Sequence, residues 1–460
     1  MELLHTSIND WQERFLAFFT VFFAGMARAE VRAAAQSYLI GLLMPLTSKN
    51  CWNIAESGGV ADPQPHQRLL RKAKWDEAAL SQGRRDYIVE HYGTDDGLFI
   101  LDETGFLKDG EHSVGVQRQY TGTAGKIENS QVAVFAAYAS PHGRVLYDTR
   151  LFLPTKWAQD ANRREEAGVP AEVEFATKIE LAQDLIDQAL TDELPMAWVT
   201  ADSFYGPSFA LRQQLIDHGL RFVMAIRANT KMYRERPKIF VNSPARTKKK
   251  AGRPRRRKQV VGELYRADDL AKMFTPSDWK RFSIGEGSKG PRVSDWAMRR
   301  VAVCQDDRGS QDLWFLARRS ISRPSEVTYF LAWAPAKTSI TELATVAGAR
   351  WQIEECFAEA KGEVGLADYQ VRKWTSWQRH MQLAMLAHLF LAELRREHGL
   401  GDVLAPLSIP ETRRLLRIVL QPEPRPVQHS LNWSIWRRNH NRKARESHYR
   451  RRLSRPLKPK

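Results

Sequence analysis

The sequence predicts an α/β fold in which helices flank a mixed sheet. Short apolar runs of the kind that form buried strands occur at three places, 98–101, 196–200 and 221–226. Helical patterns lie before and after the second run, at 172–190 and 208–218. Further strand-like runs follow the first apolar run with no helix between them, at 114–120, 131–138 and 145–153. A meander followed by alternating strands and helices is typical of a mixed sheet.

Residues 1–92, before this sheet, have helical spacing throughout and are expected to form a helical domain. The apolar stretch from Phe15 to Ala27 is too short to span a bilayer. The acidic residues ahead of it do not match the positive start of a signal peptide. We therefore expect a buried core helix and no membrane partner.

A basic helix pair in this segment is a candidate DNA-binding element. Ser48 is expected to cap a helix that ends at Gly58-Gly59, and Pro65 begins a second helix. The second helix is basic, with Arg68, Arg71 and Lys72. Two helices joined by a glycine turn suit the major groove of DNA. A surface helix pair with solvated charges fits the pattern equally well.

Residues 93–227 form the first part of the predicted sheet, and the pattern then breaks for about a hundred residues, too long for a plain loop. We expect an inserted, strand-rich subdomain at 228–325, with strand-like runs at 297–303 and 313–317. The sheet resumes at 326–400, with a strand at 327–331 and helices at 339–362 and 377–398.

Positive charge is concentrated in two tracts of a chain whose formal net charge is +17. The first tract lies inside the insertion and includes Lys249, Arg255 and Arg256. The second belongs to the segment 401–460, expected to serve DNA binding or dimerisation, and includes Arg437, Arg438, Arg450 and Arg451. Such a balance favours a polyanion as partner, and nucleic acid is the commonest one. Charge runs are usually solvated in the free protein and can become ordered on DNA.

Several polar residues near the second and third strands are further candidates for contact with the DNA backbone: Tyr120, Lys126, Asn129 and Gln131. A polar hairpin turn around Gly122 and Gly125 is the simpler explanation.

The three cysteines, Cys51, Cys304 and Cys356, are far apart and form no CxxC pair. We therefore expect no structural zinc site. Their number and spacing fit a reducing cytoplasm better than a disulfide framework.

Three acids are candidates for a shared site. Asp102 and Asp202 directly follow apolar strands, and open sheets place ligand sites beyond their strand ends. Aspartates at such positions also serve as ordinary turn residues. Glu354 follows Arg350 by four residues and precedes Lys361 by seven, so the three share one helical face. A solvated charge stripe would look the same. Glu355, the rival acid, is turned away by about 100°.

Phosphoryl transfer explains why such groups would converge. Its attacking and leaving oxygens both need charge stabilisation, which two metal ions supply. Mg²⁺ or Mn²⁺ prefers carboxylate oxygens. Arg350 and Lys361 beside the acids would hold a phosphate of the DNA strand.

Three segments resemble bacterial insertion-sequence transposases of the DDE superfamily. They are Leu101–Phe106 (LDETGF), Ala201–Gly206 (ADSFYG) and Arg350–Lys361 (RWQIEECFAEAK). The resemblance extends over nearly the whole chain and is strongest to the branch named after insertion sequence seven-oh-one. Relatives carry a Y-x2-R-x3-E-x6-K signature. The last three members fall on Arg350, Glu354 and Lys361, and Ala347 stands where the tyrosine would be.

The resemblance implies an RNase H-like core in which Asp102, Asp202 and Glu354 hold two Mg²⁺ ions, with Mn²⁺ as a substitute. It implies cut-and-paste transposition, in which DNA is hydrolysed at the transposon ends and the freed 3′-hydroxyls attack target DNA. A homodimer on paired ends, working in the nucleoid of a bacterial cytoplasm, is the corresponding expectation.

In similar transposases a tryptophan of the insertion stacks against a displaced base, and Trp296 and Trp314 are the candidates. A tryptophan in a strand-rich subdomain is also a common core residue.

Two other functions remain open on the same fold: a catalytically silent DNA-binding regulator and a structure-specific nuclease.

Overall fold

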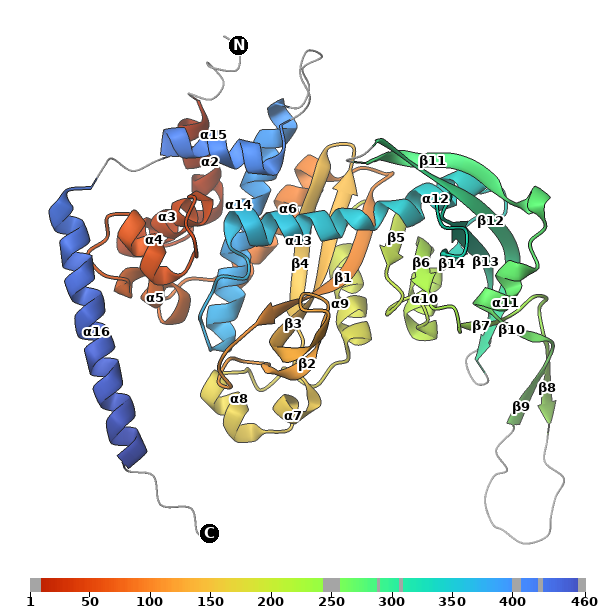
Figure 1. Ribbon diagram of the computed structural model, residues 1–460, viewed down its shortest axis with the longest axis horizontal. Coiled ribbons are helices and arrows are strands. Elements are labelled where there is room, and N and C mark those ends of the chain that lie inside the picture. Colours follow the sequence, from red (N-terminus) through yellow and green to blue (C-terminus); the bar gives the residue numbers. More distant parts are fainter. Residues whose placement is uncertain are drawn as a thin grey trace, which may run out of the picture.

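The computed structural model describes residues 10–242, 257–287, 290–305, 309–398, 407–420 and 425–453 (Figure 1). The N-terminal part is helical, as predicted: α2 (Trp11–Phe23), α3 (Ala29–Leu43), α4 (Cys51–Ser57), α5 (Gln64–Arg71) and α6 (Glu77–Tyr92). The predicted core helix is α2, which buries Trp11, Phe15, Phe18, Phe19 and Phe23. No helix in the described ranges is long and apolar enough to cross a membrane.

Six strands follow α6: β1 (Leu98–Leu107), β2 (Gln117–Thr121), β3 (Lys126–Ser140), β4 (Gly143–Leu151), β5 (Trp198–Ala201) and β6 (Arg221–Ile226). β3 lies between β1 and β4 and is antiparallel to both. β5 and β6 continue the sheet beyond β1, parallel to it. The resulting order, β4-β3-β1-β5-β6, is that of an RNase H-like sheet, so the fold class is confirmed.

The insertion is strand-rich, as expected, and its elements are β7 (Lys231–Tyr233), β8 (Lys238–Asn242), β9 (Arg257–Val261), β10 (Leu264–Arg266), α11 (Ala267–Lys272), β11 (Lys280–Gly287), β12 (Gly290–Gln305) and β13 (Gly309–Arg319). β14 (Val327–Trp333) pairs with β6 on one side and with β13 on the other. The insertion therefore extends the core sheet, which has 12 strands within the described ranges. Lys249, Arg255 and Arg256 lie outside the described residues.

The remaining helices are α7 (Thr155–Ala158), α8 (Ala161–Ala167), α9 (Lys178–Thr191), α10 (Phe209–Asp217), α12 (Ile340–Ala349), α13 (Trp351–Val364), α14 (Trp374–His398), α15 (Ile409–Leu420) and α16 (Val427–Leu453). Figure 1 shows α13 crossing the strands of the core sheet. The prediction of one helix over 339–362 is wrong, because the helix is interrupted at Arg350, which ends α12 and begins α13.

The prediction that Ser48 caps the first helix of the basic pair is also wrong. Asn50 caps α4, because its side-chain oxygen accepts hydrogen bonds from the backbone N–H groups of Trp52 and Asn53. Ser48 contributes its carbonyl oxygen to the Asn53 side chain. The glycine turn at 58–59 is as expected, and Gly59 has a positive φ of 75°.

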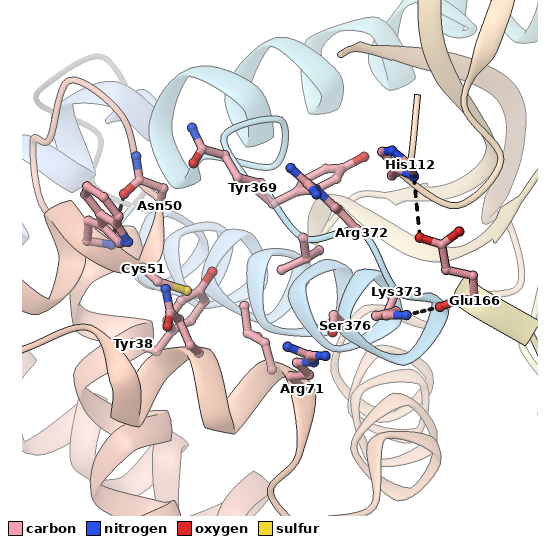
Figure 2. Close-up of a pocket in the computed structure, with 15 residues that line it drawn as sticks. Tyr38, Asn50, Cys51, Arg71, His112, Glu166, Tyr369, Arg372, Lys373 and Ser376 are labelled. Atoms are coloured by element: carbon pink, nitrogen blue, oxygen red, sulfur yellow. Dashed lines mark hydrogen bonds and ion pairs between the residues drawn. The ribbon is translucent and has the colours of Figure 1, made fainter. Parts of the chain in front are cut away.

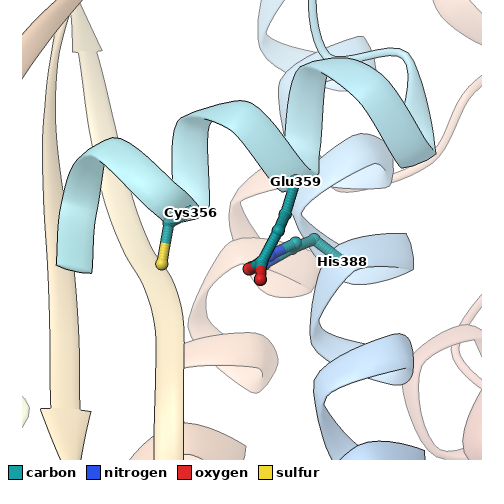
Figure 3. A group of neighbouring side chains, drawn as sticks. All are labelled: Cys356, Glu359 and His388. Atoms are coloured by element: carbon teal, nitrogen blue, oxygen red, sulfur yellow. The ribbon is translucent and has the colours of Figure 1, made fainter. Parts of the chain in front are cut away.

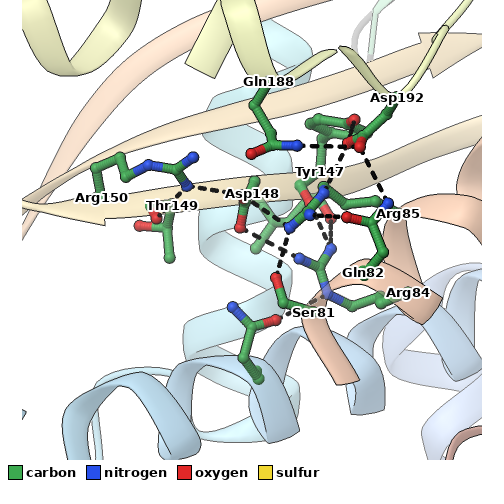
Figure 4. Close-up of polar contacts among 12 residues, drawn as sticks. Ser81, Gln82, Arg84, Arg85, Tyr147, Asp148, Thr149, Arg150, Gln188 and Asp192 are labelled. Carbon is green, nitrogen blue, oxygen red and sulfur yellow. Dashed lines mark hydrogen bonds and ion pairs between the residues drawn. The ribbon is translucent and has the colours of Figure 1, made fainter. Parts of the chain in front are cut away.

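Buried ion pairs join the N-terminal helices to the sheet (Figure 4). Arg84 and Arg85 of α6 both contact Asp148 of β4, at 3.4 and 3.3 Å. Arg85 also pairs with Asp192, directly after α9, at 2.7 Å. Since the side chains of Arg84 and Asp148 are 0% and 2% exposed, each charge depends on the other for stabilisation.

The C-terminal helix α16 stands beside the N-terminal helices as a separate rod (Figure 1). Its contact with the body is local. Trp433 is fully buried and donates its indole N–H to the Val60 carbonyl at 2.9 Å. Trp436 packs edge-on against Trp52, and Arg437 forms an ion pair with Glu56.

Candidate active site

Asp102 lies in the middle of β1, which continues to Leu107. The prediction that it ends its strand is therefore wrong for β1 as a whole. It is correct for the pairing with β5, because the parallel ladder between the two strands stops at Leu101 and Ala201. Beyond that point, within the described ranges, β1 pairs with β3 alone, and its edge toward β5 has no strand partner. We call the end of the β1–β5 ladder the step in the sheet. Asp102 is the first residue of β1 beyond it.

Asp202 directly follows β5, as predicted, at the same step in the sheet. Its Oδ1 accepts a hydrogen bond from the backbone N–H of Phe204 at 2.9 Å, which fixes the carboxylate in a tight turn. The turn continues to Gly206, where an added Cβ would come within 1.9 Å of the Ala225 carbonyl oxygen. Only glycine therefore allows this loop to lie against β6.

Arg350 connects two of the three predicted acids. Its Nη1 lies 3.1 Å from Asp102 Oδ2, and its Nη2 lies 2.5 Å from Glu354 Oε1. Because a single guanidinium reaches both carboxylates, Asp102 and Glu354 lie close together although 252 residues separate them in the chain. Glu355 points elsewhere, toward Arg144 at 2.6 Å.

Electrostatics link the two aspartates. Burial, followed by the nearby Asp202 carboxylate, raises the pKa of Asp102 to about 7, although Arg350 opposes this shift. The pKa of Asp202 is also raised, first by burial and then by the Glu103 carboxylate. These shifts mean that the folded protein holds negative charge here at an energetic cost.

Hard divalent cations fit this donor set. The three acids offer only carboxylate oxygens, which Mg²⁺ and Mn²⁺ prefer. A cation between Asp102 and Asp202 would offset the cost of burying their charges, the main cause of both raised pKa values, and the repulsion that Asp202 exerts on Asp102. Glu354 is more exposed than either aspartate, with 56% of its side chain accessible, so it is open to an ion from solvent.

Lys361 does not join this group. Its ammonium donates to Thr104 Oγ1 at 2.7 Å, to the Gly105 carbonyl at 3.1 Å and to Thr123 Oγ1 at 3.2 Å. Burial lowers the pKa of Lys361 to about 8. The side chain thus braces β1 against the β2–β3 turn, and its contact with DNA stays a prediction.

Glu103 is a fourth acid at the site, which the sequence analysis missed. Neighbouring residues of a strand face opposite sides of the sheet, so Glu103 points away from Arg350 and toward α9. It accepts hydrogen bonds from Lys178 at 2.8 Å and from the Tyr205 hydroxyl at 2.6 Å. Tyr205 is fully buried and lies in the same loop as Asp202, so this bond ties the loop to β1.

The structure contradicts the prediction that Trp296 stacks on DNA. The side chain is fully buried, and its ring packs between Phe282 and Phe330. It lies in the interior because it belongs to β12, against which α12 packs. Trp314 is half-buried, with Arg300 over its ring at 4.4 Å.

Among the polar residues of the β2–β3 region, Gln131 is also structural. It is fully buried and bonds to the Val114 carbonyl and the Tyr369 hydroxyl, at 2.6 and 2.8 Å. Asn129 donates to the carbonyls of Lys108 and Gly110. Lys126 remains exposed and pairs with Glu128 at 3.0 Å, and Tyr120 is 64% exposed.

The basic residues of α5 point in two directions. Arg68 and Lys72 line an open cavity of about 390 Å³ beside α3. Arg71 instead lines a cavity of about 450 Å³ that the N-terminal helices share with the core, as do Arg372 and Lys373 (Figure 2).

The basic residues of α16 include Arg438 and Arg450, which are exposed, and Arg451 lies in the same helix. DNA contact by these residues stays a prediction.

Among the described residues, the three acids do not bring their ligand atoms within 4.8 Å of one another, whereas one other group does. Cys356, Glu359 and His388 bring ligand atoms within 4.8 Å of one another (Figure 3). Arg144 already pairs with Glu359 at 2.7 Å, and His388 bonds to the same carboxylate at 3.4 Å. A buried guanidinium therefore balances this acid, and the group needs no metal ion for charge balance.

Comparison with known proteins shows the family of the chain. Residues 21–291 match the family described as DDE superfamily endonuclease. This segment covers more than half of the chain and includes Asp102 and Asp202, whereas Glu354 lies beyond it. The chain belongs to this family.

A probable transposase for insertion sequence element IS701, from Microchaete diplosiphon, is 28% identical over 193 residues. The match covers 41% of this chain and 47% of that protein, so this chain spans about half the length of its relative. Among solved structures, a piggyBac transposase synaptic complex with hairpin DNA aligns over 91% of this chain and 84% of its own, with a TM-score of 0.41 and 10% identity.

Proposed function

We propose that this protein is a DNA transposase that cuts DNA and joins the freed 3′-hydroxyl ends to target DNA. The observation that supports this most directly is the convergence of Asp102 and Glu354 on the Arg350 guanidinium, with Asp202 beside Asp102. Acids that are remote in the sequence and lie near one another in the fold are expected for a site that holds cations. Membership of the DDE superfamily endonuclease family agrees with this chemistry.

In the proposed mechanism Asp102, Asp202 and Glu354 would hold two Mg²⁺ ions. Such ions would supply charge stabilisation for the attacking and leaving oxygens. Asp202 is held in place by its turn and by the Tyr205–Glu103 bond. Arg350, which pairs with Asp102 and Glu354, would hold a phosphate of the DNA strand.

The proposed partner is double-stranded DNA, both at the transposon ends and at the target. The formal net charge of +17 supports a polyanion. Arg68 and Lys72 on α5 and the exposed arginines of α16 are the proposed backbone contacts. A homodimer on paired ends, acting at the bacterial nucleoid, is proposed from the resemblance to insertion-sequence transposases.

Cleavage and strand-transfer assays with transposon-end DNA test the proposal. We expect Asp102→Asn, Asp202→Asn and Glu354→Gln each to abolish Mg²⁺-dependent cleavage while DNA binding persists. Glu355→Gln, the same change one position along α13, is the matched control and should retain cleavage. Full cleavage by any of the three site variants would remove that residue from the metal site.

The same assays separate the alternatives. A regulator would bind end DNA and release no cut product in Mg²⁺. A structure-specific nuclease would cut but would not join a DNA substrate with a free 3′-hydroxyl to target DNA. Chelation of the metal should stop both cleavage and joining in the proposed transposase.

A further inference from the structure

A third cavity shares Asp202 and Arg350 with the candidate active site. It has a volume of about 410 Å³. Its walls come from four parts of the chain: the loop after β5, the end of β6, the insertion strands with β14, and the junction of α12 and α13. Three arginines line it, Arg292 of β12, Arg318 of β13 and Arg350, and we call it the arginine pocket.

Arg350 is paired with Asp102 and Glu354, but the positive charges of the other two pocket arginines are poorly balanced. Within the described ranges, neither Arg292 nor Arg318 forms an ion pair. Arg318 donates to Thr328 Oγ1 at 3.1 Å, and Arg292 makes only a long contact with the Gly348 carbonyl at 3.4 Å. Glu355 is the acid that acts on Arg292, but it is engaged with Arg144.

Two of the pocket arginines act on the third. Burial lowers the pKa of Arg318, and the nearby Arg350 and Arg292 lower it further. Like charges gathered in a partly buried cavity destabilise the free protein, and an anion between them would relieve this repulsion. This group of arginines is therefore better explained by the binding of an anionic ligand than by a contribution to the stability of the fold.

Small and flat side chains keep the pocket open. Ala347 and Gly348 line it on the helical side, where larger side chains would reduce its volume. Trp351 forms another wall, and the Arg292 guanidinium lies over its ring at 4.5 Å. Guanidinium groups held flat in this way present their N–H donors edge-on, the geometry that matches phosphate oxygens.

We infer that the arginine pocket binds a phosphate group of the DNA strand next to the one that reacts, with Arg292 and Arg318 as binding residues. The identity of the anion as DNA rests on the proposed function, whereas the anion site itself does not. The insertion thereby supplies part of the active site. The strand is held by β12 and β13 on one side and by the acids of β1, β5 and α13 on the other.

Inorganic phosphate tests the site in the full-length protein without DNA. The thermal midpoint is measured in sodium phosphate and in sodium chloride of equal ionic strength. Phosphate also strengthens folding by general exclusion from the surface, so only differences between variants count. We expect wild type to gain more from phosphate than Arg318→Gln or Arg292→Gln.

Arg319→Gln is the matched control. It removes the same charge from the next residue of β13, which faces the other side of the sheet and pairs with Asp295 at 3.1 Å. It should keep the wild-type response to phosphate. Equal responses in wild type and both pocket variants would overturn the anion site, and two variants guard against a folding defect in either one.

A fluorescent DNA duplex with a single-stranded extension then tests the DNA assignment. Binding is measured over a range of salt concentrations in Ca²⁺, which leaves the DNA uncut. Each phosphate contact contributes about 0.9 to the slope of log affinity against log salt, so Arg318→Gln should reduce the slope by about that amount. Arg319→Gln should not.

An unchanged slope together with a lost phosphate response would overturn DNA as the source of the anion. The proposed function is judged separately. Asp102→Asn should abolish cleavage but keep the phosphate response, since it leaves all three arginines in place.

Discussion

Replacing Asp102 with asparagine should stabilise the metal-free protein, although it destroys the proposed metal site. The folded-state pKa of Asp102 is raised from 3.8 to about 7 by burial and by Asp202. Folding therefore favours the protonated form, and the free energy of unfolding falls as pH rises from the unfolded value toward 7. One pKa unit corresponds to about 1.36 kcal/mol, so the full shift amounts to at most about 4 kcal/mol. An asparagine side chain carries no charge, so the variant does not lose this free energy of unfolding as the pH rises.

Urea denaturation in the presence of a chelator measures the effect. At about pH 8 the Asp102→Asn variant should be more stable than wild type by a few kcal/mol, and near pH 4 the difference should largely vanish. Asp217→Asn, on the exposed side of α10, controls for the loss of one negative charge. Adding Mg²⁺ should then stabilise wild type and leave the variant unchanged. If the stability difference were the same at both pH values, the pKa of Asp102 would not be raised in the folded protein.

Three further substitutions test other parts of the fold. Gly206→Ala should destabilise the protein by about 2–3 kcal/mol and reduce metal affinity, because the new Cβ meets the Ala225 carbonyl and pushes the Asp202 loop away; calorimetry with and without Mg²⁺ measures both effects. Asp148→Ala should lower the free energy of unfolding by about 3–5 kcal/mol, because it leaves Arg84 buried without a charge partner; urea titration checks this, and a loss within about 0.5 kcal/mol of zero would contradict it. Trp433→Ala should release α16 from α4, which limited proteolysis would detect as faster cleavage within 427–453, while cleavage elsewhere stays at the wild-type rate.

The local elements were largely predictable from the sequence, because each depends on the pattern of its own residues. The strand at 221–226 matches β6, and the buried α2 follows from the apolar stretch at 15–27. β1 extends beyond its apolar run, because pairing with β3 continues to Leu107 and this ladder lies far away in the sequence. The break at Arg350 was likewise invisible in the helical spacing, which is continuous across it.

For the site, residue type and strand position indicated the acids, whereas the partners of these acids depend on the fold. Glu103 was passed over because its neighbour Asp102 matched the pattern. The role of Tyr205 follows only from its packing against β1. Arg292 and Arg318 had no sequence signal, since only the pairing of β13 with β12 and β14 brings them beside Arg350. Trp296 had a sequence signal that was misleading, because the sequence does not show whether a tryptophan in a strand faces the interior or the solvent.

The insertion begins and ends at the same rung of the β-ladder. Ile226, the last residue of β6, pairs with Tyr329 near the start of β14, so the residues between them occupy the place of a hairpin turn. A tight loop across this rung would restore an uninterrupted chain without moving the strands that carry Asp102 and Asp202. The insertion is thus a separable part of the fold, and under the proposed function its exchange would alter the binding of DNA while Asp102, Asp202 and Glu354 remain in the core.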